Sequence, residues 1–87
     1  FFLGLPARLA KKLLELARLY GEPAGEGVRI AHRVSQQDLA KLAGASREGV
    51  NKQLRTWELQ GVIEVRRWQV TLRRPAILEE LVAVARA

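Results

Sequence analysis

The chain has 87 residues, 48% of them hydrophobic, and its 15 Lys and Arg against 9 Asp and Glu give a net charge of +6. This length suits one small domain, and the apolar content is enough for a core, which argues against disorder. With no cysteine and a single histidine, the sequence excludes a disulfide framework and a zinc site built from those residues. No apolar run has the length needed to span a bilayer, so we expect no membrane partner. The positive charge favours an anionic partner.

The first third of the sequence predicts one helix and one short strand. Pro6 suits the first turn of a helix, and apolar residues recur at helical spacing from Leu9 to Tyr20. Three glycines and Pro23 within residues 21–27 predict the end of this helix and a loop. Residues 28–34 are short and mixed in polarity, and we expect an edge strand there.

Two short helices in close succession come next. Ser35 is a suitable N-cap for the first, which Gly44 ends, and Ser46 is a suitable N-cap for the second, which extends to Gln60. The small side chain of Ala40 lets the two helices approach, and Gly44 can adopt the positive φ of a tight turn. This pattern is typical of a helix-turn-helix.

The last third predicts a β-hairpin followed by a helix. Residues 62–65 and 68–72 have the composition of two strands, with the turn around Arg66 and Arg67. Pro75 then begins a final apolar helix. The order helix, strand, helix, helix, hairpin, helix predicts a mainly α fold with a small β-hairpin wing, a winged helix-turn-helix, as a single domain over the whole chain.

The second helix of the predicted helix-turn-helix has two distinct faces. At about 100° per residue, an apolar stripe lies opposite a long polar face that is mostly cationic. We expect the stripe to pack on the preceding helix, Leu59 to pack beneath the hairpin, and the polar face to stay in water. The stripe consists of Val50, Leu54 and Trp57, its expected partners are Leu39, Leu42 and Ala43, and the polar face holds Arg47, Glu48, Asn51, Lys52 and Arg55.

The beginning of this helix suggests a chemistry. Ser46, Arg47 and Glu48 crowd its N-terminus, which is the end that points into the major groove when a helix-turn-helix docks on DNA. Arginine can hold a guanine edge with two hydrogen bonds, and a carboxylate can accept one from cytosine. The alternative interpretation is an ordinary solvated helix face with Glu and Lys pairs.

Three stretches of the sequence resemble the C-terminal DNA-binding domain of the CRP/FNR family of bacterial transcription regulators. They are RLAKKLLELARLYGE at residues 8–22, VSQQDLAKLAGASREGVNKQLRTWELQGVIEVRRWQVTL at 34–72, and ILEEL at 77–81. The resemblance implies that three side chains read bases in the major groove, namely Arg47, Glu48 and Lys52. It also implies that phosphate contacts or helix caps are supplied by Ser35, Gln36, Gln37 and Ser46. From the residues themselves, we expect the DNA backbone to be contacted or supported by Asn51, Arg55, Arg66 and Arg67.

The resemblance also implies what surrounds this domain. Family members carry an N-terminal β-roll sensor, often for a cyclic nucleotide, joined to the DNA-binding part by a long dimerisation helix. Because the sequence begins with Phe1 rather than methionine, we expect a fragment of a longer protein, with residues 1–3 as the last trace of that connection. Any effector would then bind the missing sensor domain, and no cofactor is expected in this chain. The full-length protein would be a homodimer, and this fragment would be a monomer.

Several residues depart from the family pattern. Gly49 stands where threonine is frequent, which removes a possible phosphate contact. Lys52 stands where arginine is usual, so a bidentate grip on guanine becomes a point-charge contact. Trp68 stands where glycine is common at the wing tip, and we expect its ring to pack on the helix beneath the hairpin. Arg73 and Arg74 would add positive charge to the wing.

Taken together, the sequence predicts sequence-specific binding of double-stranded DNA for transcription regulation, in the bacterial cytoplasm and at the nucleoid. RNA polymerase is a further candidate partner. The alternative is a winged helix that serves as a protein–protein interaction module, which keeps the fold but needs no cationic face. An enzyme is not expected, because the sequence offers no plausible nucleophile–base pair, and the hydroxyls of Ser35 and Ser46 are accounted for as helix caps.

Overall fold

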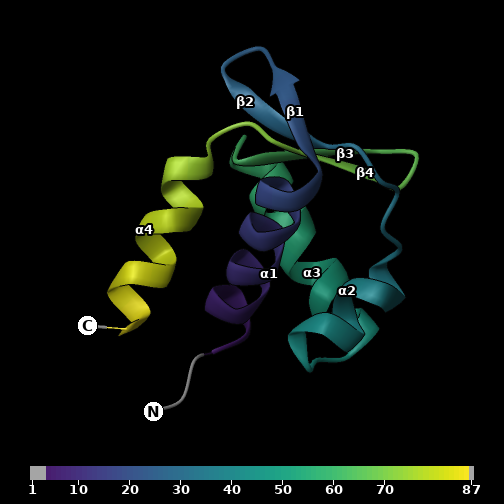
Figure 1. The fold of residues 1–87 in the computed structure, drawn as a ribbon. Helices are drawn as coiled ribbons and strands as arrows, with labels where there is room; N and C mark the ends of the chain where they lie inside the picture. Colours follow the sequence, from purple (N-terminus) through teal and green to yellow (C-terminus); the bar gives the residue numbers. More distant parts are fainter. Residues whose placement is uncertain (1–3, 87) are drawn as a thin grey trace.

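A computed structural model describes residues 4–86 of the chain (Figure 1). This part contains α1 Leu5–Tyr20, β1 Gly21–Ala24, β2 Gly27–Ile30, α2 Gln36–Ala43, α3 Arg47–Leu59, β3 Ile63–Arg66, β4 Gln69–Leu72 and α4 Pro75–Arg86. The fold is the predicted winged helix-turn-helix: the sheet lies over one end of the helices, and α1 packs against α4 as well as against α2 and α3. The expected trace of a dimerisation helix, at residues 1–3, lies outside the described residues.

The sheet combines two hairpins in the strand order β1-β2-β4-β3, and every pairing is antiparallel. β1 and β2 form the first hairpin, and β3 and β4 form the second, which is the wing. The two hairpins join through a short pairing of Val28 with Leu72 and of Arg29 with Thr71. The wing is therefore one half of a four-stranded sheet rather than a free hairpin.

Both helices of the helix-turn-helix begin at the predicted serine caps. The Ser35 hydroxyl oxygen accepts a hydrogen bond from the backbone N–H of Asp38, and the Ser46 hydroxyl oxygen accepts one from Gly49, each at 3.0 Å. Such caps stabilise a helix by about 1 kcal/mol each. Gly44 ends α2 with a φ of 65°, a conformation that glycine adopts without steric cost. The two helices therefore begin and end where the sequence predicts.

One apolar core joins the helices to the sheet. Among the described residues, no polar or charged side chain is buried, so burial of apolar area is what drives these elements together. The core consists of Leu9, Ala10 and Leu13 from α1, Leu39, Ala40 and Ala43 from α2, Val50, Leu54 and Trp57 from α3, Leu78 from α4, and Ile30, Val62, Ile63, Val70 and Leu72 from the sheet region.

The structure corrects the expectation of a loop at residues 21–27 and of an edge strand at 28–34. Residues 21–24 form β1, which is itself an edge strand, and the following strand ends already at Ile30 and lies between β1 and β4. Pro23 is tolerated in β1 because an edge strand leaves some N–H positions unpaired. Gly21 is required for close approach, since a Cβ there would collide with the carbonyl oxygen of Ala17.

The turn of the wing is shifted by one residue from the predicted position. The strands pair Arg66 with Gln69, so the two turn residues are Arg67 and Trp68, with φ values of 49° and 68°. A two-residue hairpin with positive φ at both positions is a type I′ turn, whose usual signature is Asn-Gly. Because that signature is absent here, no local pattern indicated the true turn.

Three apolar side chains are more exposed than expected. Leu42 does not join the partners of the α3 stripe, and Leu59, expected beneath the hairpin, is 85% exposed at the end of α3. Trp68, whose ring was expected on the helix beneath the hairpin, is 56% exposed at the wing tip. Within the described residues, the buried core residues of α3 are therefore the three of its predicted stripe.

Candidate nucleic-acid interface

The two faces of α3 are separated as predicted. Val50, Leu54 and Trp57 are buried in the core. On the opposite side four charged side chains are exposed, and within residues 4–86 none of them forms a side-chain hydrogen bond or an ion pair. These four, called the α3 charged face below, are Arg47, Glu48, Lys52 and Arg55.

The N-terminus of α3 lies at the exposed end of the helix-turn-helix. Ser46, Arg47 and Glu48 are all exposed there. Glu48 in the first turn is favourably placed for the positive end of the helix dipole. The structure thus leaves the predicted base-reading residues accessible on a helix whose other side is fixed in the core.

Gly49 fits into a confined space between α3 and α1. A Cβ added at this position would lie 3.1 Å from Leu5 Cδ2 and 3.1 Å from Ser46 Oγ. Leu5 is the first residue of α1 and packs against the core. The glycine that departs from the family pattern therefore coincides with a close contact between the two helices.

Two residues expected near the DNA backbone contact each other. The Asn51 side-chain amide donates a hydrogen bond to the Gln36 amide oxygen at 2.8 Å, joining α3 to the first residue of α2. Gln36 retains its own NH₂ group as a donor. Gln37, next in the chain, is exposed, whereas Ser35 and Gln36 are half-buried. Asn51 and Gln36 were predicted independently to lie near the DNA backbone, and in the structure a hydrogen bond joins them.

Arg8, which was not predicted as a functional residue, fixes the turn of the helix-turn-helix. Its Nε donates a hydrogen bond of 2.8 Å to the carbonyl oxygen of Ala43, and its Nη2 reaches the carbonyl oxygen of Gly44 at 3.4 Å. These carbonyls lie at the C-terminal end of α2, where a positive charge is favourable. The partners are 35 and 36 residues apart in the sequence, so no local pattern indicated this contact.

The wing tip is attached to the segment that leads into α2. The Val34 N–H donates to the Trp68 carbonyl oxygen at 2.8 Å, and the Gln69 amide donates to the Ala31 carbonyl oxygen at 3.0 Å. The tip thus lies beside the segment that leads into α2, as Figure 1 also shows. Arg66 and Arg67 are both exposed there, and Arg66 Nε lies 3.6 Å from Glu64 Oε2.

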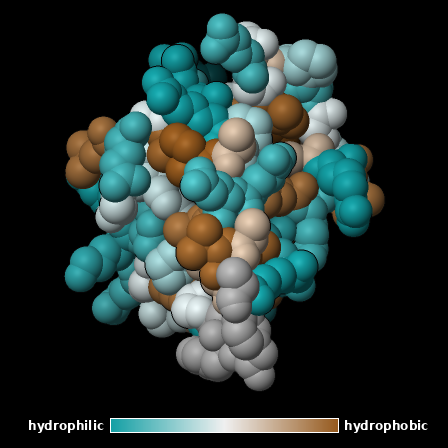
Figure 2. Space-filling view, turned by 90° about the vertical axis from the view of Figure 1, so that its left-hand side faces the viewer, coloured by the Kyte–Doolittle hydropathy of each residue, from teal (hydrophilic) through white to brown (hydrophobic). Residues whose placement is uncertain are grey.

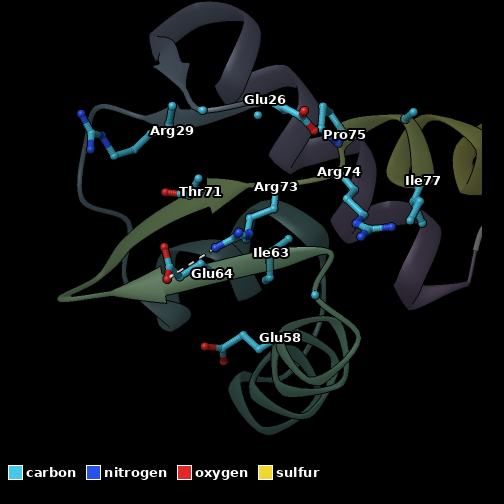
Figure 3. A pocket seen from close by; sticks show the side chains of 15 residues that line it. Glu26, Arg29, Glu58, Ile63, Glu64, Thr71, Arg73, Arg74, Pro75 and Ile77 are labelled. Carbon is cyan, nitrogen blue, oxygen red and sulfur yellow. Dashed lines mark ion pairs between the residues drawn. The ribbon is translucent and has the colours of Figure 1, made fainter.

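Arg73 and Arg74 lie at the other end of the wing and do not add charge to its tip. They line an open hollow of about 1300 Å³ bounded by the β1–β2 turn, the sheet and the start of α4 (Figure 3). Arg73 points toward Glu64, with Nη1 3.9 Å from Oε2. The charged side chains that line this hollow are Arg29, Arg73 and Arg74 together with Glu26, Glu58 and Glu64.

The side of the molecule that carries α4 has a mixed surface. Figure 2 shows apolar side chains standing between polar ones on this side. Ile77 and Val84 are among the exposed apolar residues of α4.

No group of three potential metal ligands occurs in the described part of the chain. No helix within residues 4–86 is long and apolar enough to cross a membrane.

Residues 7–81 match the family model described as the Crp-like helix-turn-helix domain. The "CRP-like cAMP-activated global transcriptional regulator" of Mycobacterium tuberculosis is 42% identical over 64 residues, which are 74% of this chain and 29% of that protein. The "Global nitrogen regulator" of Synechocystis is 31% identical over 74 residues, which are 85% of this chain and 33% of that protein. The chain therefore spans a third or less of the length of these relatives, which are named as regulators and not as enzymes.

Solved structures share the fold. A transcriptional regulator of the CRP family from Thermus thermophilus superposes with a TM-score of 0.81 at 30% identity, covering 92% of this chain and 40% of that one. A CRP/FNR-family regulator from the same organism superposes with a TM-score of 0.84 at 25% identity, covering 95% of this chain and 42% of that one. In both cases nearly the whole described fold corresponds to part of a longer chain.

Proposed function

The chain belongs to the family of Crp-like helix-turn-helix domains, and from this premise we propose that it binds double-stranded DNA sequence-specifically and thereby regulates transcription. The observation that carries the proposal is the α3 charged face: cationic and accessible, it lies on a helix that is capped at Ser46 and buried along its opposite stripe. A helix of this kind fits the major groove, which admits an α-helix and displays distinct hydrogen-bonding edges.

Base reading is assigned to three residues at the start of α3. Arg47 would hold guanine O6 and N7 with two hydrogen bonds, and Glu48 would accept a hydrogen bond from cytosine N4. Lys52, one turn further along the helix, would supply a point charge with rotatable donors. The absence of internal partners for these side chains within residues 4–86 supports the assignment, because none of them has to break a contact to reach DNA.

Backbone contacts are assigned to the groups around α3. Ser35 and Ser46 use a hydroxyl oxygen as helix cap and keep the O–H as a donor for phosphate. Gln36, positioned by Asn51, keeps its NH₂ group for the same purpose. The remaining backbone contacts would come from Gln37, Arg55, Arg66 and Arg67, all of which are exposed.

We further propose that this domain is the output part of a longer homodimeric regulator. Its relatives are about three times as long as the matched part, and a preceding sensor domain would bind the effector, such as a cyclic nucleotide. A dimer would read a palindromic operator, and RNA polymerase would be the downstream partner in the cytoplasm, at the nucleoid. The 87-residue chain alone would be monomeric and would bind in the non-specific range, with Kd of about 10⁻⁴–10⁻⁶ M.

Selection of binding sites from random duplex DNA tests the proposal. The full-length protein should enrich a two-fold symmetric consensus, and the 87-residue chain should bind duplex DNA with an affinity that falls steeply as salt rises. The absence of any enriched sequence would contradict specific recognition. Failure of both proteins to bind duplex DNA at low salt would leave the protein-interaction module as the function of the fold.

A further inference from the structure

The wing tip has a conformation that its residues do not favour. Arg67 and Trp68 both have positive φ, at 49° and 68°. Side chains other than glycine, asparagine and aspartate rarely adopt this region, and a bulky residue there is an outlier. A type I′ turn is satisfied best by Asn-Gly. Such local strain is often found at functional sites, where the strained side chain has a task.

Trp68 does not pack in the core. Trp68 is 56% exposed, whereas the other tryptophan, Trp57 in α3, is 4% exposed. The strand residues Val65 and Val70, which pair with each other just before the tip, supply the apolar contact to the core on this side. The indole of Trp68 thus stands as a large apolar surface at the outer end of the wing.

The backbone at Trp68 is held close to the proposed DNA surface. The Trp68 carbonyl oxygen accepts a hydrogen bond from Val34, which directly precedes the α2 cap Ser35. The tip therefore cannot move away from the N-terminus of α2 without losing this contact. Arg66 and Arg67, which directly precede Trp68 in the chain, are both exposed.

We propose that Trp68 is a DNA-contact residue whose ring lies against the deoxyribose of the strand held by the N-terminus of α2. This inference rests on the proposed function. Deoxyribose presents an apolar C–H surface between phosphates, and an indole offers a large apolar area with one N–H donor. The two arginines neutralise phosphates on either side, while the ring supplies affinity that does not depend on charge. The contact is independent of sequence, because every nucleotide has the same sugar.

Affinity measured over a range of salt concentrations separates this contact from those of the arginines. The 87-residue chain is titrated into a short fluorescein-labelled duplex of mixed sequence, and anisotropy is followed. Trp68→Gly should weaken binding about tenfold with the slope of log K against log salt unchanged, because an apolar contact releases no counterions. Arg67→Ala should lower that slope by about 1. Leu59→Ala, which removes an exposed apolar side chain far from the N-terminus of α3, should bind like the parent chain.

Two further readouts exclude a structural role and a stacking role. Trp68→Gly should unfold at a temperature no lower than that of the parent chain, because glycine relieves the positive φ. With the duplex bound, Trp68 should become protected from acrylamide quenching and its emission should shift to the blue. Strong static quenching would indicate stacking on a base and would overturn the sugar contact, as would a fall in the unfolding temperature of Trp68→Gly.

The outcomes also distinguish this inference from the proposed function. If the parent chain does not bind the duplex at any salt concentration, the proposed function fails. If the parent binds with a steep salt dependence and Trp68→Gly binds equally well, the proposed function stands and the role of Trp68 is overturned.

Discussion

The α3 charged face and the hollow at the base of the sheet both contain arginines, but they differ in what those arginines face. On α3, three cations and Glu48 are exposed, and none of these side chains is paired within residues 4–86. In the hollow, three arginines stand among three glutamates, and Arg73 is paired with Glu64. Because positive charges outnumber negative ones on the α3 charged face and are balanced in the hollow, we expect an anion to favour the α3 charged face. Substitutions in each region test this contrast.

The largest effect is expected where the support of the α3 charged face is removed. Leu54→Ala deletes most of a buried side chain on the inner stripe and should lower the free energy of unfolding by about 2–5 kcal/mol. Chemical denaturation followed by circular dichroism measures this loss. Leu59→Ala on the same helix is the matched control and should stay within about 0.5 kcal/mol of the parent, because Leu59 is exposed. Equal effects of the two substitutions would contradict the assignment of the two faces.

Removal of a proposed base-reading group should change recognition without changing the fold. Arg47→Ala should cost about 1–3 kcal/mol on the preferred site and relax the preference at one base pair. Binding to a set of single-base variants of the selected site measures both quantities. Arg18→Ala, an exposed arginine on α1, is the control for a simple loss of charge. An unchanged preference in Arg47→Ala would show that this side chain does not read a base.

The attachment of α1 to the helix-turn-helix should contribute a smaller amount. Arg8→Ala removes the donors to the carbonyl oxygens of Ala43 and Gly44 and should lower stability by about 1–2 kcal/mol. Arg8→Lys keeps the charge near the end of α2 but not the planar fork, so it should recover only part of this loss. If Arg8→Ala has the same free energy of unfolding as the parent chain, this contact does not hold α2 in place.

The smallest effect on DNA binding is expected from replacing a single arginine at either end of the wing. Arg66→Ala at the tip should weaken binding to all sequences alike and reduce the salt slope by about 1. Arg73→Ala, the same substitution at the base, should leave both affinity and slope unchanged. Both arginines lie close to Glu64 Oε2, at 3.6 Å and 3.9 Å, but Arg73 lies away from the tip, in the hollow that Glu26 and Glu58 also line. Equal reductions from the two substitutions would remove the distinction between tip and base.

The sequence predicted what depends on neighbours along the chain. Ser35 and Ser46 act through N–H groups only three residues away, and the α3 stripe follows from helical period alone. The resemblance to known regulators added roles for Arg47, Glu48 and Lys52, and these remain predictions.

What the sequence did not predict depends on partners far along the chain. β1 has the composition of a turn and becomes a strand only because β2 pairs with it. Arg8 finds its partners 35 and 36 residues away. At the wing, Arg67 and Trp68 form a type I′ turn without its usual Asn-Gly sequence. The predicted turn was therefore one residue too early, and Trp68 was wrongly predicted to pack on the helix.

The confined space around Gly49 couples two positions that are far apart in the sequence. A Cβ at residue 49 would lie 3.1 Å from Leu5 Cδ2 and 3.1 Å from Ser46 Oγ, so these neighbours would have to shift by a few tenths of an ångström. When α3 is grafted onto another domain and residue 49 gains a side chain, residue 5 is therefore the position to adjust with it.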